Sequence, residues 1–395
     1  MTRRPAGAFL AAAATVGTAS AADTIKIGVL LIDSGPLAGL KVSQTKAVNL
    51  AIEEVNAAGG AAGRKFEADF ISYPGTPNSA VDGATRAVQK DGALFLTGMD
   101  NSAVSPALSA KLTTLNALMI EVYPQADALT GKACAPNYFR ANVNDSMLMN
   151  AASRFLKQNA AVKKWDIMAV DYASGRDAAA KFQMLVKAQG GTIGKVLFTP
   201  SGAADFGAKI SDLGVDPGDG LYVTIFGSDA INLAKQQAQF GLFAKYKLVL
   251  GNSFVIPQVL PAMGDTVVCV YQTLGFVPGE AGAGGEAFFK ACKTKYNGEL
   301  PAYTAADQYA AIQLMAAAIS KANSTDVAAV RAALAGLKTD TVLGPVEVRA
   351  GDHQTARPIL MNLIDKNAEE KPAYQIKQVF PGDALLPPVD KACKM

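Results

Sequence analysis

The sequence holds few of the side chains that enzymes use for catalysis, and their spacing excludes the commonest sites. Its 395 residues include a single histidine, His353, so a site with two or more imidazoles, as in the usual zinc enzymes, cannot form. The motifs GxSxG and GxxxxGK(S/T) are absent, and GxGxxG does not follow the first apolar run. We therefore expect no hydrolase, P-loop or dinucleotide site, no metal and no cofactor.

One pair of carboxylates leaves acid–base catalysis open as an alternative. Asp33 and Asp100 both follow predicted strands and could face one cleft, where a carboxylate pair can act as acid and base. Aspartates in such loops more often form turns. On balance, the sequence predicts a binding protein and not an enzyme.

Small polar side chains after another apolar run could bind an anion. Asn101 and Ser102 can donate hydrogen bonds, and a helix predicted from Ser105 would direct its backbone N–H groups and positive dipole end to the same place. A carboxylate could be held there without an arginine. The alternative is that Ser102 and Ser105 only cap the helix, a role that stabilises it by about 1 kcal/mol.

The N-terminal segment has the features of an export signal. Residues 1–22 combine basic Arg3 and Arg4, an alanine-rich apolar run and the small residues Ala19-Ser20-Ala21, as in a cleaved secretory signal peptide. We expect removal of this segment and a periplasmic mature protein; the alternative is a disordered alanine-rich tail. No other stretch reaches the ~18–20 apolar residues of a membrane helix, so we expect no membrane span.

Length and charge bound the number of domains and the kind of partner. The chain is longer than the ~100–200 residues of one domain, which predicts two domains. It has 37 basic and 34 acidic residues, and without Arg3 and Arg4 the basic residues number 35. A nearly neutral mature chain disfavours nucleic acid as a partner.

Four cysteines, an even number, lie in the mature part of the chain. In an exported protein this indicates two disulfides, and three pairings are possible. We favour Cys134–Cys393, which would tie back the end of the chain, and Cys269–Cys292, which are close in sequence. There is no CxxC pair, so a structural zinc site is not indicated.

Strand and helix patterns alternate along the chain in two series. The run Thr24–Ile32 is continuously apolar, as in a buried strand, and the next segment has apolar residues at helical spacing. Repeated units of this kind predict the α/β class with a doubly wound parallel sheet. The pattern restarts near Arg140–Asp145, which predicts a second such sheet, and three helical patterns after it suggest that the chain crosses back to cover the first sheet. The further predicted strands are Phe66–Tyr73, Ala93–Thr97, Leu118–Val122, Trp165–Val170, Ile193–Phe198, Leu221–Ile225, Tyr246–Leu250, Val267–Gln272, Val346–Arg349, Ile359–Ile364 and Tyr374–Val379, and the helices include Ser79–Lys90, Ser105–Leu115, Ser146–Gln158, Arg176–Gln189, Phe206–Leu213, Ala230–Phe240, Glu286–Tyr296, Ala305–Lys321 and Val327–Leu337.

Six segments, spread in order over nearly the whole mature chain, together match one known family. They are IKIGVLLIDSGPLAG, NAAGG, LTGKACAPN, VDYASGRDAA, INLAKQQAQFGL and AYTAADQYAAIQLM. In combination they resemble the type I periplasmic solute-binding proteins, the family that includes the leucine/isoleucine/valine-binding protein. The resemblance implies a type I periplasmic binding protein fold, in which two α/β lobes are joined by a three-crossover hinge and close over a ligand held between them.

The resemblance also implies the domain boundaries and the partners. Lobe I would comprise residues 23–142 and 274–343, and lobe II residues 143–273 and 344–395, with crossovers near Asn142, Thr273 and Gly344. Members of the family deliver a small molecule to the membrane permease of an ABC transporter and catalyse nothing. We expect the same of this chain, as a monomer.

The cleft residues are carried over from the family onto loops that follow strands. In lobe I, Tyr123 aligns with a backbone contact to the ligand carboxylate, although it could instead be a plain wall residue, and Gln125 takes a position that usually holds a hydroxyl. In lobe II, Tyr172 and Ser174 fall where the family often places an aromatic lid. With Asn101 and Ser102, the expected site also includes Phe226, Gly227, Asn252, Ser253, Phe254 and Phe276.

A missing acid indicates the class of ligand. In the amino-acid binders of the family, the loop at Asn252 and Ser253 supplies a carboxylate that pairs the ligand's α-ammonium, because an unpaired buried cation is costly. Neither residue can do this, and Asp229, which could, is more ordinarily a helix N-cap. The aromatic residues of the expected site would suit a flat ring.

Two of the matching segments, LTGKACAPN and VDYASG, also resemble the branch of the family assigned to aromatic acids and other carboxylates that are not amino acids. We therefore favour a small carboxylate, such as a benzoate, as the ligand. The alternatives are a branched-chain or other aliphatic amino acid or a short amide, or a ligand sensor that serves a separate receptor.

Overall fold

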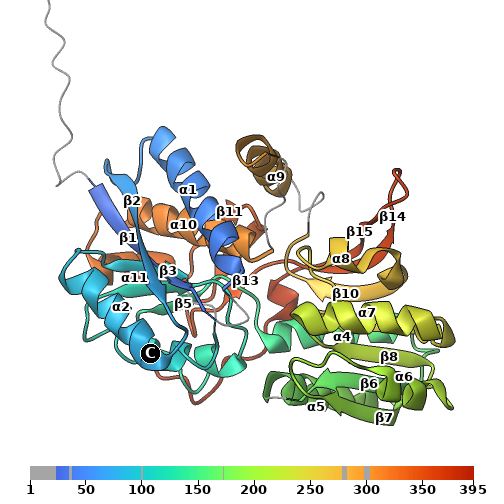
Figure 1. Ribbon diagram of the computed structural model, residues 1–395. Coiled ribbons are helices and arrows are strands. Elements are labelled where there is room, and N and C mark those ends of the chain that lie inside the picture. The colour runs from blue at the N-terminus through green and yellow to red at the C-terminus, as the bar shows by residue number, and fades with distance from the viewer. Residues whose placement is uncertain (1–23, 35–37, 99–100, 172, 278–282, 298–302) are drawn as a thin grey trace, which may run out of the picture.

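The computed structural model describes residues 24–34, 38–98, 101–171, 173–277, 283–297 and 303–395. They form two lobes that lie side by side and are joined by segments passing between them (Figure 1). The expected signal segment, residues 1–22, lies outside the described residues. In the ranges given above, no helix is long and apolar enough to span a bilayer.

Lobe I is built on a five-stranded parallel sheet with the order β2-β1-β3-β4-β5. β1 (Thr24–Ile32) has the predicted bounds, because it is buried along most of its length between helices on both faces. The sheet is therefore doubly wound, as predicted. Its other strands are β2 (Lys65–Tyr73), β3 (Phe95–Gly98), β4 (Leu118–Glu121) and β5 (Tyr138–Arg140), and the helices of the lobe are α1 (Leu40–Ala57), α2 (Pro77–Gln89), α3 (Ser105–Ser109), η2 (Asp127–Thr130), α9 (Ala283–Lys295), α10 (Tyr303–Ala322) and α11 (Val327–Leu334).

Lobe II contains a seven-stranded sheet with the order β15-β14-β10-β9-β8-β6-β7. The strands from β6 to β10 are parallel, and the hairpin of β14 and β15 adds two antiparallel strands at one edge. One core lies under α4 and α5, and a second lies under α6, α7 and α8. The elements are α4 (Asp145–Gln158), β6 (Lys164–Val170), α5 (Ala173–Ala188), β7 (Thr192–Thr199), α6 (Gly207–Gly214), β8 (Gly220–Thr224), α7 (Gly227–Phe240), η3 (Phe243–Lys245), β9 (Leu248–Asn252), α8 (Leu260–Met263), η4 (Gly264–Val267), β10 (Val270–Leu274), β14 (Ile359–Lys366), β15 (Pro372–Phe380) and η5 (Asp383–Leu385).

Side-chain caps explain why some predicted helices begin close to their expected positions. At α2, the Thr76 side chain accepts from the Ser79 N–H and the Ser79 side chain bonds back to the Thr76 backbone, a capping box. At α4, the Asn144 side chain accepts from the Met147 N–H. By contrast, α3 is much shorter than predicted, because hydrogen-bonded turns replace the helix after Ser109.

The third crossover lies later in the chain than expected. A small antiparallel sheet of β11 (Lys338–Thr341), β12 (Gly344–Val348) and β13 (Thr355–Ala356) follows α11. Val346 and Val348 pack in the core of lobe I, so residues 344–356 belong with lobe I and not, as expected, with lobe II. The chain enters lobe II only at Arg357 and Pro358, immediately before β14.

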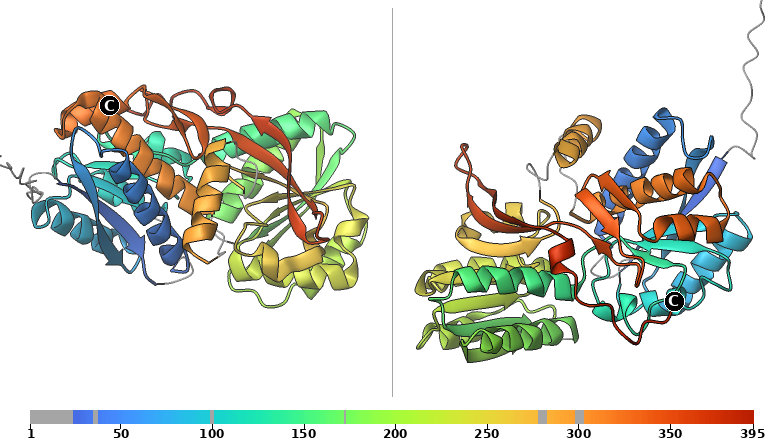
Figure 2. Two further views of the ribbon diagram at one scale, coloured as in Figure 1. Left: turned by 90° about the horizontal axis from the view of Figure 1, so that it is seen from above. Right: turned by 180° about the vertical axis from the view of Figure 1, so that it is seen from behind.

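The C-terminal tail also returns to lobe I. The predicted disulfide Cys134–Cys393 is present, with 5.5 Å between the two Cα atoms. The C-terminus accordingly lies on lobe I in both views of Figure 2, away from the hairpin of β14 and β15. The tail is therefore a further connection between the lobes, beside the three crossovers.

The predicted disulfide Cys269–Cys292 is wrong. Both cysteines are free. Cys269 is exposed and precedes β10 in lobe II, whereas Cys292 is buried on α9 in the core of lobe I. The second crossover lies between them, so their nearness in sequence does not bring them together in space.

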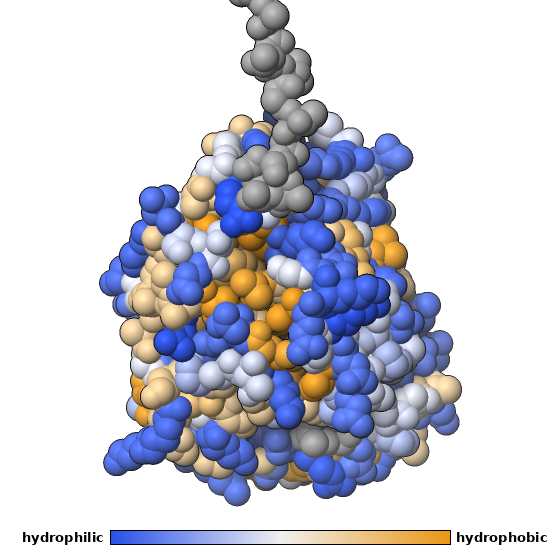
Figure 3. All heavy atoms as spheres, turned by 90° about the vertical axis from the view of Figure 1, so that its left-hand side faces the viewer, coloured by the Kyte–Doolittle hydropathy of each residue, from blue (hydrophilic) through white to orange (hydrophobic). Residues whose placement is uncertain are grey.

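Polar and apolar side chains share the surface of lobe I on the side away from lobe II. Figure 3 shows an apolar area there that is bordered by polar residues. On this lobe β2 is an edge strand, and its Phe70 has 37% of its surface exposed. No contact of the described residues assigns a role to this area.

Candidate functional site

The predicted anion-binding loop of lobe I has a different hydrogen-bond arrangement from the one expected. Asn101 and Ser102 are half-buried, and the Asn101 Oδ1 accepts from the Ala103 N–H at 2.9 Å. Neither Ser102 nor Ser105 caps α3. Ser105 is buried and donates its hydroxyl to the Asn101 carbonyl at 3.0 Å and to the Glu121 carboxylate. Since α3 has only five residues, we assign no anion site to its N-terminus.

A fully buried carboxylate at the end of β4 was missed by the sequence interpretation. Glu121 accepts hydrogen bonds from the Ser105 and Tyr138 hydroxyls and lies opposite Arg140 in the parallel register. Arg140 is also fully buried, and its guanidinium donates at 2.7 Å to Gln354 and to the Ala126 carbonyl. The only signal in the sequence was a glutamate that closes an apolar strand.

The loop after β4 lies against the start of lobe II. The Tyr123 carbonyl accepts from the Asn142 side-chain amide at 2.7 Å, and the Gln125 carbonyl accepts from the Asp145 N–H at 3.0 Å. Both Tyr123 and Gln125 are half-buried. The two predicted residues of this loop therefore lie at the first crossover, where a ligand could contact both lobes.

Several of the predicted lobe II residues lie at the ends of strands, as expected. Phe226 is half-buried immediately before α7, and Gly227 is exposed with φ +60°, which favours glycine. Asn252 ends β9 with 9% of its surface exposed, and Ser253 follows it with φ +52°. Ser174 falls in the first turn of α5, and Tyr172 lies outside the described residues.

Two predicted aromatic residues do not line the junction of the lobes in this conformation. Phe254 is completely buried and packs in a core of lobe II, with its ring 6.1 Å from that of Phe243. Phe276 is 1% exposed and packs against Phe288 and Phe289 in the core of lobe I. Aromatic residues after strands pack into a core as readily as they line a cleft, and here packing prevails.

Asp229, the remaining acid for an amino-acid ligand, is occupied within lobe II. It is buried, accepts from the Gly202 N–H at 2.7 Å and contacts the Ser228 hydroxyl at 3.3 Å. It does not cap α7, which has no side-chain cap. Asp33 is exposed, and its suggested catalytic partner Asp100 lies outside the described residues.

The single histidine is a packing residue near the third crossover. His353 is buried, its ring stacks on Phe139 at 3.8 Å, and its Nδ1 lies 3.1 Å from the Tyr138 carbonyl oxygen. Burial lowers the pKa of His353 to about 4, with Asp352 opposing the shift. The ring is therefore uncharged at neutral pH, and its surroundings are those of a structural residue.

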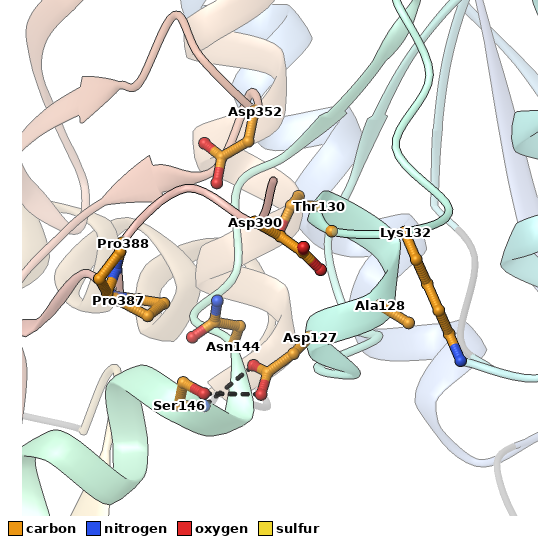
Figure 4. Close-up of a pocket in the computed structure, with 11 residues that line it drawn as sticks. Asp127, Ala128, Thr130, Lys132, Asn144, Ser146, Asp352, Pro387, Pro388 and Asp390 are labelled. Atoms are coloured by element: carbon orange, nitrogen blue, oxygen red, sulfur yellow. Dashed lines mark hydrogen bonds between the residues drawn. The ribbon is translucent and has the colours of Figure 1, made fainter. Parts of the chain in front are cut away.

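A cavity of about 320 Å³ lies between the lobes beside the C-terminal tail (Figure 4). Asp127 of lobe I reaches across it to lobe II, where it accepts from Ser146 through both the N–H at 3.0 Å and the hydroxyl at 2.6 Å, and pairs with Lys181 at 3.0 Å. Burial would raise the pKa of Asp127, but the Ser146 hydrogen bonds and Lys181 hold it below its usual value. None of the predicted site residues lines this cavity, and its Asp127 serves to join the lobes.

The sequence matches one protein family over most of its length. A family model described as periplasmic binding protein matches residues 24–369. Leu/Ile/Val-binding protein homolog 4 of Brucella abortus (strain 2308) is 25% identical over 413 residues, covering 99% of this chain and 97% of its own.

Solved structures with the same fold include proteins that bind different kinds of ligand. A solute binding protein of an ABC transporter from Rhodopseudomonas palustris BisB5, in complex with 3,4-dihydroxybenzoic acid, has a TM-score of 0.82 at 21% identity, covering 91% of this chain and 98% of its own. A leucine binding protein from Thermotoga maritima MSB8 has a TM-score of 0.76 at 20% identity, covering 91% and 99%. The fold is thus that of two-lobed solute-binding proteins, as predicted.

Proposed function

Because this chain belongs to the periplasmic binding protein family, we propose that it captures a small aromatic carboxylate between its two lobes in the periplasm and presents it to the permease of an ABC transporter. The residues proposed to bind the ligand are the predicted set without Phe254 and Phe276, which pack in the cores of the lobes. They are Asn101, Ser102, Tyr123, Gln125, Ser174, Phe226, Gly227, Asn252 and Ser253, with Tyr172 from outside the described residues.

The choice of ligand class rests on the absence of a free carboxylate at the position where the amino-acid binders of the family provide one. A bound amino acid brings an α-ammonium, which needs a carboxylate partner once it is buried. The strand end expected to provide that partner presents the amide of Asn252, and Asp229, the other candidate, already accepts from Gly202 and Ser228. A carboxylate without an ammonium group makes no such demand. The dihydroxybenzoate complex with the same fold supports this choice.

An aliphatic amino acid is the second candidate. The curated relative is named for leucine, isoleucine and valine, and a leucine binding protein shares the fold. This candidate requires a carboxylate near the lobe junction. Asp145 lies there, but it is already 3.7 Å from the Lys181 ammonium, so the aromatic carboxylate remains the favoured ligand.

The two lobes suggest how binding would be signalled to a permease. The loop of Tyr123 and Gln125 belongs to lobe I, and Asn252 belongs to lobe II. A ligand that contacts both makes all its contacts only when the lobes are close together. It therefore favours the closed form by its differential affinity for that form, and the permease could recognise the closed form.

A thermal-shift screen tests the ligand class. We expect the mature protein to be stabilised by benzoate and hydroxybenzoates, and not by leucine, isoleucine or valine. A ligand that binds only the folded state at a hundredfold excess over its Kd contributes about 2.7 kcal/mol, which gives a shift of a few degrees in a chain of this size. Stabilisation by leucine alone would contradict the aromatic proposal and leave the family assignment intact.

Replacing Ser102 by Ala tests the lobe I half of the site. If the Ser102 hydroxyl donates to the ligand carboxylate, its loss is expected to weaken binding about tenfold, since a hydrogen bond to a charged group contributes about 1.5 kcal/mol. Isothermal titration calorimetry measures the change. Ser320→Ala, an exposed serine at the end of α10, is the matched control and should bind as the wild type does. Equal affinity of the two variants would remove Ser102 from the site.

A further inference from the structure

Three buried side-chain oxygens at one end of the lobe II sheet make no hydrogen bond of ordinary geometry within the described part of the chain. They are the Tyr222 hydroxyl, the Thr224 hydroxyl and the Asn252 Oδ1. Tyr222 and Thr224 are at most 1% exposed, and Asn252 is 9% exposed. Buried polar groups are nearly always paired in folded proteins, so three unpaired oxygens in adjoining positions require an explanation. We call them the oxygen row.

The strand register places the oxygen row on one face of the sheet. Val223 of β8 lies opposite Gly251 of β9, so the next residues, Thr224 and Asn252, are neighbours at the carboxyl ends of the two strands. Tyr222 precedes Thr224 by two residues and therefore shares its face. Burial raises the pKa of Tyr222, and a side-chain hydrogen bond with Asn252 opposes the increase. The Tyr222 hydroxyl therefore lies beside the Asn252 amide, whose Oδ1 still lacks a donor.

Packing fixes the ring that bears the first of these oxygens. Tyr222 stacks on Phe182 of α5, with 3.9 Å between the ring centroids and 6° between the planes. The ring cannot turn away to find water, because both residues are buried in the core under α4 and α5. The hydroxyl is therefore held in place before any ligand arrives.

The oxygen row adjoins the place where the two lobes meet. Tyr222 packs in the same core as α4, which begins at Asp145. The charge of Asp145 also raises the pKa of Tyr222. The Asp145 N–H donates to the Gln125 carbonyl of lobe I at 3.0 Å. The row thus belongs to lobe II, and Asp145 connects the core in which Tyr222 packs to the Gln125 loop of lobe I.

We propose that the oxygen row binds a hydroxyl group at the end of the ligand opposite its carboxylate, so that the protein selects hydroxylated aromatic acids over unsubstituted ones. The inference rests on the proposed function. A hydroxyl can donate to the Asn252 Oδ1 and accept from Tyr222 or Thr224, which satisfies both kinds of group. An ammonium would lack a free carboxylate, since Asp145 pairs with Lys181, and a second carboxylate would find no cation in the row.

The test compares two acids that differ by one hydroxyl. Calorimetric titration of benzoate and 4-hydroxybenzoate, with 3-hydroxybenzoate as a positional control, gives the affinity ratio of the hydroxylated acid to benzoate. In the wild type we expect at least one hydroxybenzoate to bind tenfold or more tightly than benzoate. Tyr222→Phe and Thr224→Val should each reduce that ratio to threefold or less, with the affinity for benzoate unchanged.

Two controls separate recognition of the ligand from a structural role. Tyr271→Phe removes a tyrosine hydroxyl from the amino end of β10, on the same sheet face, and should keep the wild-type ratio. The melting temperature of ligand-free Thr224→Val should equal or exceed that of the wild type, because the lost hydroxyl has no partner to lose.

The outcomes that overturn the inference are distinct from those that overturn the proposed function. If the wild type binds benzoate and both hydroxybenzoates equally, or if the variants lose affinity for all of them alike, the row does not recognise a hydroxyl, while the aromatic ligand class stands. If no aromatic acid binds and leucine does, the proposed ligand class fails and the inference fails with it.

Discussion

Replacing Arg357 by Met is expected to lower the free energy of unfolding by about 3–5 kcal/mol at pH 8, because it leaves a buried carboxylate without its partner. Arg357 is 0% exposed and lies at the third crossover, between β13 and β14. Its guanidinium pairs with the buried Asp307 of α10 and donates to the Gly275 carbonyl at 2.6 Å, just after β10. One side chain therefore connects two crossovers and a lobe I helix.

The effect of this substitution should depend on pH. Burial raises the pKa of Asp307 to about 6, against the influence of Arg357, which lowers it. An acid whose pKa is higher in the folded than in the unfolded state loses its contribution to stability as the pH rises from about 4 through 6. Without Arg357 the pKa of Asp307 in the folded state rises further. The variant therefore continues to lose stability at pH values above 6, where the wild type no longer does. The destabilisation should be about 2 kcal/mol smaller at pH 5 than at pH 8.

Urea unfolding of the wild type and the variant at the two pH values measures both effects. The double variant Asp307→Asn/Arg357→Met is the control, since it removes both charges and keeps similar volumes. It should recover much of the stability at pH 8 and lose the pH dependence. An equal loss at pH 5 and pH 8 would show that packing of the Arg357 side chain, and not its charge, holds the crossovers.

The parts of the fold that were predictable are those fixed by local signals. β1 follows from one uninterrupted apolar run, and α2 and α4 follow from polar caps next to apolar positions at helical spacing. β5 was not predicted, because three residues ending in Arg140 resemble a loop. The acceptors that allow Arg140 to be buried include Gln354, 214 residues away, which accepts its Nε–H at 2.7 Å. Such a partner cannot be found from local periodicity.

In the candidate site, too, the positions of loops were predictable from the sequence, whereas the orientations of their side chains were not. Loops that follow parallel strands could be located from the sequence, so Tyr123, Gln125 and Asn252 lie near the lobe junction or at a strand end facing it. Whether an aromatic residue in such a loop faces the core or the ligand depends on neighbours from other segments, and Phe254 and Phe276 face the core. The oxygen row could not be predicted from the sequence either, because its strands have the ordinary apolar pattern of buried strands.

Removing the Cys134–Cys393 disulfide is expected to cause the other large loss of stability. At the end of η5 the tail is held on lobe II by Leu385, whose side chain packs in the core of that lobe and whose carbonyl accepts from the Asn150 side-chain amide at 2.8 Å. It then crosses to lobe I, where Arg349 donates to the Pro387 carbonyl at 2.6 Å and Cys393 bonds to Cys134. The disulfide closes a loop of 259 residues in sequence separation, so it restricts the unfolded chain strongly.

For a loop of this length the chain-entropy treatment gives about 5.6 kcal/mol, and measured losses for native disulfides are typically about 2–5 kcal/mol. We expect Cys134→Ser/Cys393→Ser to lower the urea midpoint accordingly, and reduction with dithiothreitol to lower the wild-type midpoint to the same value without affecting the variant. Cys269→Ser, which removes an exposed free thiol, should leave the midpoint unchanged. If the reduced wild type kept its midpoint, the non-covalent contacts at Leu385 and Pro387 would alone hold the tail, and the covalent bond would contribute nothing to joining the lobes.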